Sequence, residues 1–104
     1  MSILERMNSI NTMAIYDYNQ IQERLQNEWT FNVEKNEIEK EFIFADFTAA
    51  IDFIDEIAEI AEAQDHHPNL FLHDYKNVLV SVATHAEGGI TKSDFLLAAE
   101  IDKI

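Results

Sequence analysis

The sequence predicts an α+β domain in which a four-stranded antiparallel sheet carries helices packed on one face. Segments that alternate apolar and polar residues occur in two pairs, and a short polar stretch joins each pair, which is typical of β-hairpins. Segments with apolar residues three and four positions apart precede, separate and follow these pairs, which indicates amphipathic helices. The predicted order is therefore helix, strand, strand, helix, strand, strand, helix.

The composition limits the class of protein. A chain of 104 residues can form one hydrophobic core but not two. Seven basic and twenty acidic residues give a formal net charge of −13, which disfavours binding to nucleic acid and to anionic membranes. The absence of cysteine excludes disulfides and thiolate catalysis. The N-terminus lacks the apolar run of a signal peptide and no segment has the length of a membrane span, so we expect a cytoplasmic protein.

The first half of the domain contains two helices and one hairpin. Residues 1–16 show no clear pattern and are predicted to be an N-terminal extension to a domain at 17–104. A helix is expected from Asp17 to about Asn27, followed by a hairpin whose strands lie near 29–33 and 39–44. Asp46 is predicted to cap a helix of about five turns. Its expected core-facing residues are Phe47, Ala50, Ile51, Ile54, Ala58 and Ala61.

The second half repeats the pattern. Pro68 disfavours helical backbone at the residue before it, so the long helix is predicted to end at the histidines. A second hairpin is expected at 70–72 and 78–85, with Val78, Val80 and Val82 facing the core and His85 emerging at the strand end or on the other face. Gly88-Gly89 marks a turn, after which Thr91 and Asp94 are spaced as in a capping box.

Three of the four histidines are candidates for proton transfer, because histidine exchanges protons near neutral pH. His66 and His67 lie at the predicted junction of helix and strand, and His85 ends the last strand. Glu62 precedes His66 by four residues, so on a helix it would share a face with this imidazole and orient it.

Other residues with polar or aromatic side chains have structural explanations as well. Asp94 is accounted for as a first-turn carboxylate of the last helix. Trp29 fits a core position, and it could also line the pocket of a planar ligand. His73 lies in a hairpin and is interpreted as structural or exposed.

A metal site is an alternative, since the four histidines and Asp65 would supply enough ligands for zinc. Adjacent histidines rarely bind one ion through both rings, however, and the sequence lacks the His-x-x-x-His spacing. We therefore expect acid–base chemistry without a metal.

The spacing of these residues resembles a known signature. Glu62-x-x-x-His66-His67-Pro68, followed by Tyr75, His85 and Asp94, is similar to the pattern of the pterin-4a-carbinolamine dehydratases, which in animals are also dimerisation cofactors of a homeodomain transcription factor. The resemblance extends over roughly residues 17 to 104. It departs from the family pattern at Asn69, where an acidic residue is usual, and at His73-Asp74, where an asparagine is more usual.

The resemblance implies an enzyme that converts 4a-hydroxytetrahydropterin to quinonoid dihydropterin and water. It implies no metal and no prosthetic group, and association as a homodimer or homotetramer. By similarity, His66 and His85 would be the acid and the base and His67 would bind and orient the pterin. Glu62 and Asp94 would set the charge of the site, and Trp29 is a further candidate for substrate contact.

Two alternatives remain open at this point. The first is a module that binds another protein and stabilises its dimer. The second is a dehydratase-like protein of another pterin pathway, such as molybdopterin metabolism.

Overall fold

The computed structural model describes residues 14–104 and confirms the predicted order of elements. Residues 1–13 of the predicted N-terminal extension lie outside the described part. The elements are α2 (Tyr18–Arg24), β1 (Thr30–Asn32), β2 (Glu37–Ile43), α3 (Phe47–Gln64), β3 (Asn69–His73), β4 (Asn77–Val82) and α4 (Lys92–Ile101).

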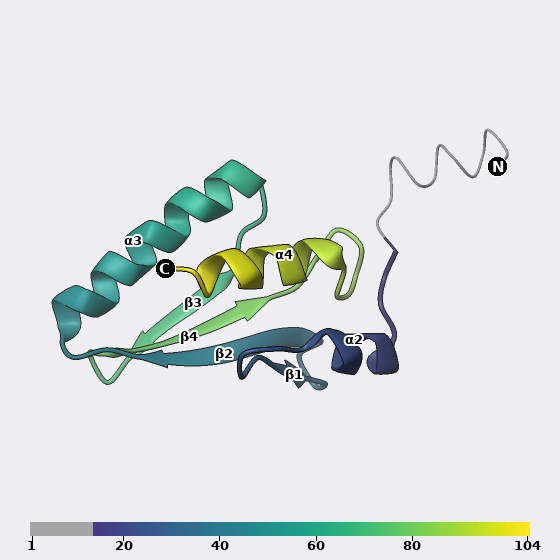
Figure 1. Ribbon diagram of the computed structural model, residues 1–104, viewed down its shortest axis with the longest axis horizontal. Helices are drawn as coiled ribbons and strands as arrows, with labels where there is room; N and C mark the ends of the chain where they lie inside the picture. Colours follow the sequence, from purple (N-terminus) through teal and green to yellow (C-terminus); the bar gives the residue numbers. More distant parts are fainter. Residues whose placement is uncertain (1–13) are drawn as a thin grey trace, which may run out of the picture.

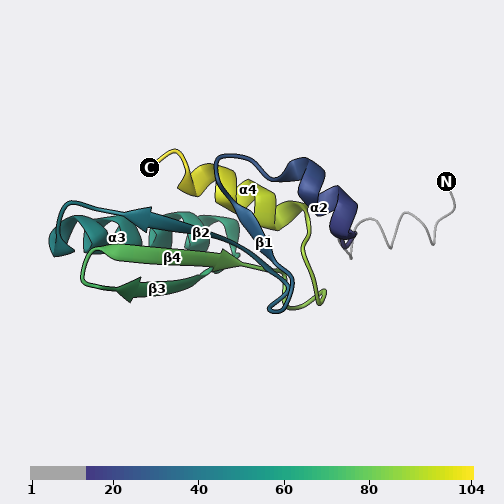
Figure 2. The same ribbon diagram turned by 90° about the horizontal axis from the view of Figure 1, so that it is seen from below.

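The four strands form one antiparallel sheet in the order β1-β2-β4-β3. The long helix α3 and the C-terminal helix α4 lie on the same face of this sheet, and no helix among residues 14–104 covers the opposite face (Figures 1 and 2). This is the predicted architecture, and it places the start of α4 next to the connection between α3 and β3 (Figure 1).

The core lies between the sheet and the two helices. Val78, Val80 and Val82 of β4 are buried, as predicted from their shared parity. The pairing of Val82 with Ile38 places another fully buried side chain on the same face of the sheet. From the helices, Ile57 of α3 and Leu97 and Ile101 of α4 complete the centre of this core.

The face that α3 buries matches the predicted one only in part. Ala50 and Ala61 are buried as expected and Ile54 packs half-buried against the core, whereas Phe53 and Ile57 are buried without having been expected and Phe47 is 52 % exposed. Apolar residues occupy more than one stripe of this helix, so spacing alone left its rotation undetermined. The rotation observed places the ring of Phe53 4.7 Å from that of Phe42 and 4.8 Å from that of Phe44, measured between centroids.

Helix α3 ends before the histidines rather than at them. Its last residue is Gln64, and Asp65 adopts a left-handed conformation with φ of 51°. The N–H of Asp65 bonds the carbonyl of Glu62, and the N–H of His66 bonds that of Ala61 at 3.1 Å, which closes the last turn. The chain therefore leaves the helix at Asp65, three residues before Pro68.

Three other elements, α2, β1 and β4, are shorter than predicted. Helix α2 ends at Arg24 because Leu25 is extended and two residues with positive φ, Asn27 and Glu28, follow it. Strand β1 spans only Thr30–Asn32, and β4 ends at Val82, so that His85 lies in the turn beyond the strand.

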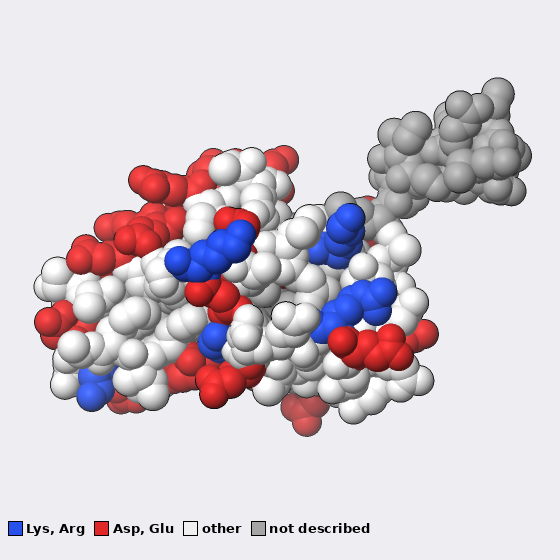
Figure 3. Space-filling view, in the orientation of Figure 1, with Lys and Arg blue, Asp and Glu red and all other residues white. Residues whose placement is uncertain are grey.

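The acidic residues gather on the outer side of α3, visible along its length in Figure 3. This helix has five acidic residues and no lysine or arginine: Asp52, Asp55, Glu56, Glu59 and Glu62. Within residues 14–104, no helix combines the length and the apolar character needed to cross a membrane.

Candidate active site

The candidate site is built around Asp94 in the first turn of α4. Thr91 is the N-cap of this helix, and the carboxylate of Asp94 accepts the Thr91 N–H at 2.9 Å, which forms the predicted capping box. The side chain of Asp94 has no exposed surface. A buried carboxylate needs several hydrogen-bond donors, because its charge is otherwise costly away from water.

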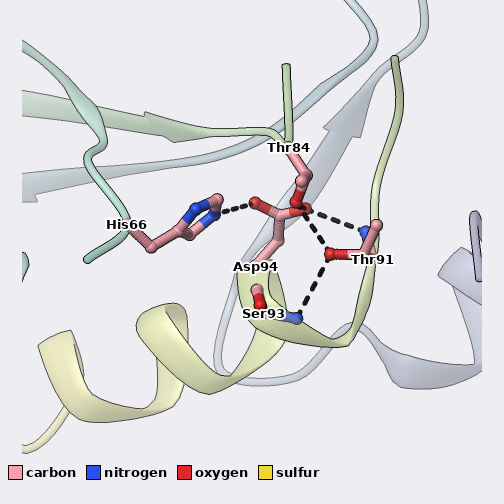
Figure 4. Close-up of polar contacts among 5 residues, drawn as sticks. All are labelled: His66, Thr84, Thr91, Ser93 and Asp94. Carbon is pink, nitrogen blue, oxygen red and sulfur yellow. Dashed lines mark hydrogen bonds and ion pairs between the residues drawn. The ribbon is translucent and has the colours of Figure 1, made fainter. Parts of the chain in front are cut away.

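Two of the remaining donors come from distant parts of the chain (Figure 4). Nε2 of His66 lies 2.6 Å from Oδ1 of Asp94, and the hydroxyl of Thr84 donates to Oδ2 at 2.8 Å. Because the single hydroxyl proton of Thr84 goes to Asp94, the hydroxyl of Thr91, 2.7 Å away, is the donor to Thr84. These contacts join the α3–β3 connection, the end of β4 and the start of α4 at one carboxylate.

The contact with Asp94 determines which ring nitrogen of His66 carries the proton. An ionised carboxylate only accepts hydrogen bonds, so Nε2 of His66 carries the proton. In the neutral imidazole the lone pair is then on Nδ1. The side chain of His66 is 15 % exposed, so the ring is held by the protein and still reaches the surface.

Glu62 contacts His67 and not His66, which corrects the expectation from sequence. Nε2 of His67 lies 2.8 Å from Oε1 of Glu62, and both side chains are mostly exposed. The i,i+4 rule failed here because it assumes helical backbone through His66, whereas the chain turns at the left-handed Asp65. An exposed pair of this kind contributes little to stability.

The backbone that carries His85 is attached to the site through Thr84. It is exposed and belongs to the turn at Thr84–Gly89, directly after Thr84, whose hydroxyl bonds Asp94. The structure therefore brings His66, Asp94 and the segment that carries His85 together. Their catalytic roles, and that of His67, stay predictions.

A hollow of about 310 Å³ lies beside His66. Its lining consists of Gln64, His66, Ser93, Leu96 and Glu100, so His66 is the one candidate histidine that lines it. The volume is at the lower end of the range for small-molecule sites. The sequence analysis did not assign the α4 residues of this lining, although the spacing of three and four between Ser93, Leu96 and Glu100 places them on one helix face.

Trp29 lies away from the histidines. Its indole N–H donates to Oδ2 of Asp102 at 2.9 Å, and Lys40 bonds the other oxygen of Asp102 at 2.8 Å. Asp102 follows the end of α4, about 12 Å along the helix axis from Asp94 at 1.5 Å per residue. The expected contact of Trp29 with substrate stays a prediction.

His73 is also separate from the site. Its ring nitrogens contact Asp74 and Glu41 on the sheet, in line with the structural role expected for it. In the described part of the chain, no three side chains among His, Asp and Glu are grouped so that they could hold a metal ion.

Comparison with known proteins identifies relatives along almost the entire described chain. The family model described as pterin 4 alpha carbinolamine dehydratase matches residues 15–104. A protein of Sulfolobus acidocaldarius to which this activity is provisionally assigned is 40 % identical over 88 residues, which cover 85 % of this chain and 96 % of that protein. The mitochondrial pterin-4-alpha-carbinolamine dehydratase 2 of Arabidopsis thaliana is 47 % identical over 58 residues, 56 % of this chain and 31 % of that protein.

Two solved structures have a similar fold. A crystal structure from Brucella melitensis, described as a transcriptional coactivator/pterin dehydratase, superposes with a TM-score of 0.80 at 32 % identity and covers 86 % of this chain and 97 % of that chain. A pterin dehydratase-like protein described as a RuBisCO assembly factor shares the fold, with a TM-score of 0.62 at 20 % identity over 75 % of this chain and 89 % of that chain. The resemblance found in the sequence is thus confirmed, and the chain belongs to the pterin 4 alpha carbinolamine dehydratase family.

Proposed function

We propose that this protein dehydrates a 4a-hydroxytetrahydropterin. In this reaction the hydroxyl on C4a takes up a proton and leaves as water, the lone pair of N5 forms the C4a–N5 double bond, and N5 loses its proton. The product is a quinonoid dihydropterin, and the overall change is the loss of one water molecule. One group must give a proton and another must take one, which suits imidazoles near neutral pH.

The observation that carries the proposal is the contact between His66 and Asp94 at 2.6 Å. Asp94 is buried and accepts from Thr91 and Thr84, so it cannot move without breaking the start of α4. It holds the Nε2–H side of His66 and leaves Nδ1 for the proton of the substrate. Asp94 also stabilises the imidazolium that forms when Nδ1 accepts a proton, as carboxylates beside catalytic histidines do.

His85 supplies the second proton-transfer group in this proposal, and His67 binds and orients the pterin. Both are exposed. His85 follows Thr84 in the chain and His67 follows His66, and the side chains of Thr84 and His66 both contact Asp94. The hollow beside His66 is the proposed place for part of the substrate. A positioned general acid or base contributes roughly 10²–10⁴-fold to the rate.

The test follows the decay of enzymatically generated 4a-hydroxytetrahydropterin with and without the purified protein. We expect the protein to accelerate the decay, and His66→Ala and His85→Ala each to remove most of this acceleration while the circular dichroism spectrum remains that of the wild type. His73→Ala is the matched control, since His73 lies on the sheet in contact with Glu41 and Asp74. Near-normal turnover in both active-site variants would refute the assignment.

A second candidate function is protein binding, which one feature of the sheet favours. Ile43 is 70 % and Phe71 60 % exposed, and the register places both on the open face, opposite the buried valines. Exposed apolar groups and unpaired strand edges favour association, either with a second copy of this chain or with another protein. We propose a homodimer or homotetramer, and light scattering after size exclusion tests it. A monomer without dehydratase activity would favour the protein-binding role.

A further inference from the structure

We propose that Asn36 is a positioning residue that holds the turn carrying His85. Asn36 lies far from His85 in the chain, at the end of the turn between β1 and β2. The inference rests on the proposed role of His85 in proton transfer, and it names a residue that acts through the backbone of the turn and does not contact the substrate.

The His85 turn is closed on its inner side by its own backbone. The N–H of Thr84 bonds the carbonyl of Gly89 at 2.9 Å, and the N–H of Gly88 bonds the carbonyl of Thr84 at 3.0 Å. The hydroxyl of Thr84 fixes the start of the turn to Asp94. The outer part, His85 and Ala86, is exposed and lies outside the strands and helices, and the carbonyl of His85 accepts the N–H of Gly88 at 3.1 Å.

Asn36 contacts this turn through its side chain. Its Nδ2 donates to the carbonyl oxygen of Gly88 at 3.1 Å, across 52 residues of sequence. The carbonyl can only accept, so the amide nitrogen and not the amide oxygen faces Gly88. The contact ties the turn to the first hairpin, which is itself part of the sheet.

The backbone of Asn36 favours this geometry. Its φ of 55° is left-handed, a conformation that asparagine adopts more readily than most residues other than glycine. The N–H of Asn36 bonds the carbonyl of Val33 at 3.3 Å and closes the hairpin turn. The side chain is therefore projected from a fixed backbone position.

The end of the His85 turn is also held by backbone and packing contacts with residues 15 and 16. The N–H of Tyr16 bonds the carbonyl of Ile90 at 2.8 Å. A side chain at Gly89 would meet Cγ2 of Ile15 at 2.8 Å, so the two segments are in close contact there. These contacts hold Gly89 and Ile90, and the Asn36 contact restrains the adjacent carbonyl of Gly88.

If Asn36 positions His85, its loss should lower kcat, which would not follow if Asn36 only stabilised the fold. A proton-transfer group that is displaced by about 1 Å can lose as much as 10²-fold in rate. Loss of one neutral hydrogen bond should cost less than this, so we expect kcat to fall roughly tenfold in Asn36→Gly, with little change in KM. Glycine also adopts the left-handed backbone and removes the side chain with its amide.

The experiment compares three variants in the full chain. Asn36→Gly removes the contact, and Asn36→Asp keeps the size of the side chain but replaces the donor with an acceptor. Asn27→Gly is the matched control, because Asn27 also has a left-handed backbone, with φ of 54°, and its amide contacts Asp102 at the opposite end of α4. We expect both Asn36 variants to lose kcat and Asn27→Gly to retain it.

Two readouts separate this inference from the proposed function. In a His85→Ala background, Asn36→Gly should cause no further loss of kcat, because the group that it positions is already absent. Independently of activity, NMR relaxation should show increased motion of the His85 ring in Asn36→Gly and not in Asn27→Gly. An inactive wild-type protein would refute the proposed function, while the relaxation result would still decide whether Asn36 holds the turn. An equal loss of kcat with and without His85, or unchanged motion of its ring, would overturn the inference.

Discussion

Nε2 of His66 lies 2.6 Å from Oδ1 of Asp94, a residue 28 positions further along the chain. The same carboxylate accepts the N–H of Thr91 and so starts helix α4. One buried group therefore serves the fold and the candidate site together. Because these two functions use different oxygens of Asp94, substitutions can be designed to separate them.

Asp94→Asn should lower turnover strongly while the protein stays folded with a moderate loss of stability. Three donors, from His66, Thr84 and Thr91, converge on two carboxylate oxygens, whereas an amide has one acceptor oxygen. We expect the free energy of unfolding to fall by about 1–3 kcal/mol, measured by urea denaturation. Turnover of the carbinolamine, measured on the same preparation, should fall strongly because His66 loses the partner that sets its tautomer.

The control for this prediction is Asp46→Asn at the start of α3. Asp46 also caps a helix, and its Oδ1 accepts the N–H of Ala49 at 2.8 Å, but it contacts no histidine. Asparagine is an equally good N-cap, so stability and turnover should both be retained. Full turnover in Asp94→Asn, combined with the expected loss of stability, would show that Asp94 supports only the helix.

Thr84→Val should destabilise the protein, although it preserves the shape of the side chain. The Thr84 hydroxyl accepts from Thr91 and donates to Asp94, so valine removes one donor from the buried carboxylate and the acceptor for the hydroxyl proton of Thr91. We expect a loss of about 1–3 kcal/mol from urea unfolding curves. Thr30→Val is the control, since its exposed hydroxyl makes only a 3.5 Å contact with the carbonyl of Glu39. Equal unfolding midpoints in the two variants would contradict the inferred chain of hydrogen bonds.

The fold could be predicted from the sequence because its signals are local. Alternation marked the strands, and Thr91 and Asp46 marked the starts of two helices at the positions observed. The parity of Val78, Val80 and Val82 gave the buried face of β4 because a strand has only two faces. A helix has no such restriction, which is why only Ala50 and Ala61 of the four buried residues of α3 were expected.

The site could be predicted only in part, because its contacts depend on how the chain turns between elements. The sequence indicated His66 and Asp94 separately but paired His66 with Glu62, because the spacing of apolar residues did not predict the left-handed backbone of Asp65. The hydrogen bond between Trp29 and Asp102 could not be predicted either, because the two residues are 73 positions apart in the chain. Interactions of this kind are decided by tertiary packing, which periodicity does not describe.

Trp29→Phe tests whether this residue contacts the substrate. In the structure the indole N–H bonds Asp102, a carboxylate that is 13 % exposed and paired with Lys40. Loss of a hydrogen bond to a charged group should lower the free energy of unfolding by about 1.5–3 kcal/mol. We expect KM for the carbinolamine to remain unchanged, as measured by steady-state kinetics below the unfolding temperature. A raised KM in the folded variant would instead support the role in substrate binding suggested by the sequence.

His73 provides a test of the electrostatics of the sheet. Its Nδ1 lies 2.9 Å from Oδ2 of Asp74, and its Nε2 lies 2.6 Å from Oε1 of Glu41. The hydrogen bond with Asp74, reinforced by the hydrogen bond and charge of Glu41, raises the pKa of His73 above its ordinary value of 6.5, although desolvation acts in the opposite direction.

The raised pKa of His73 predicts the sign of a pH effect. The folded chain binds this proton more tightly than the unfolded chain does, so His73 stabilises the protein fully below pH 6.5, the ordinary value. The contribution is lost as the pH rises through the higher pKa of the folded state. The difference in free energy of unfolding between wild type and His73→Gln should therefore be larger at about pH 5.5 than at about pH 8.5. Urea denaturation at both pH values measures it, and the shared titration of the other groups cancels in the difference. A difference that does not change with pH would show that the two carboxylates do not hold the protonated ring.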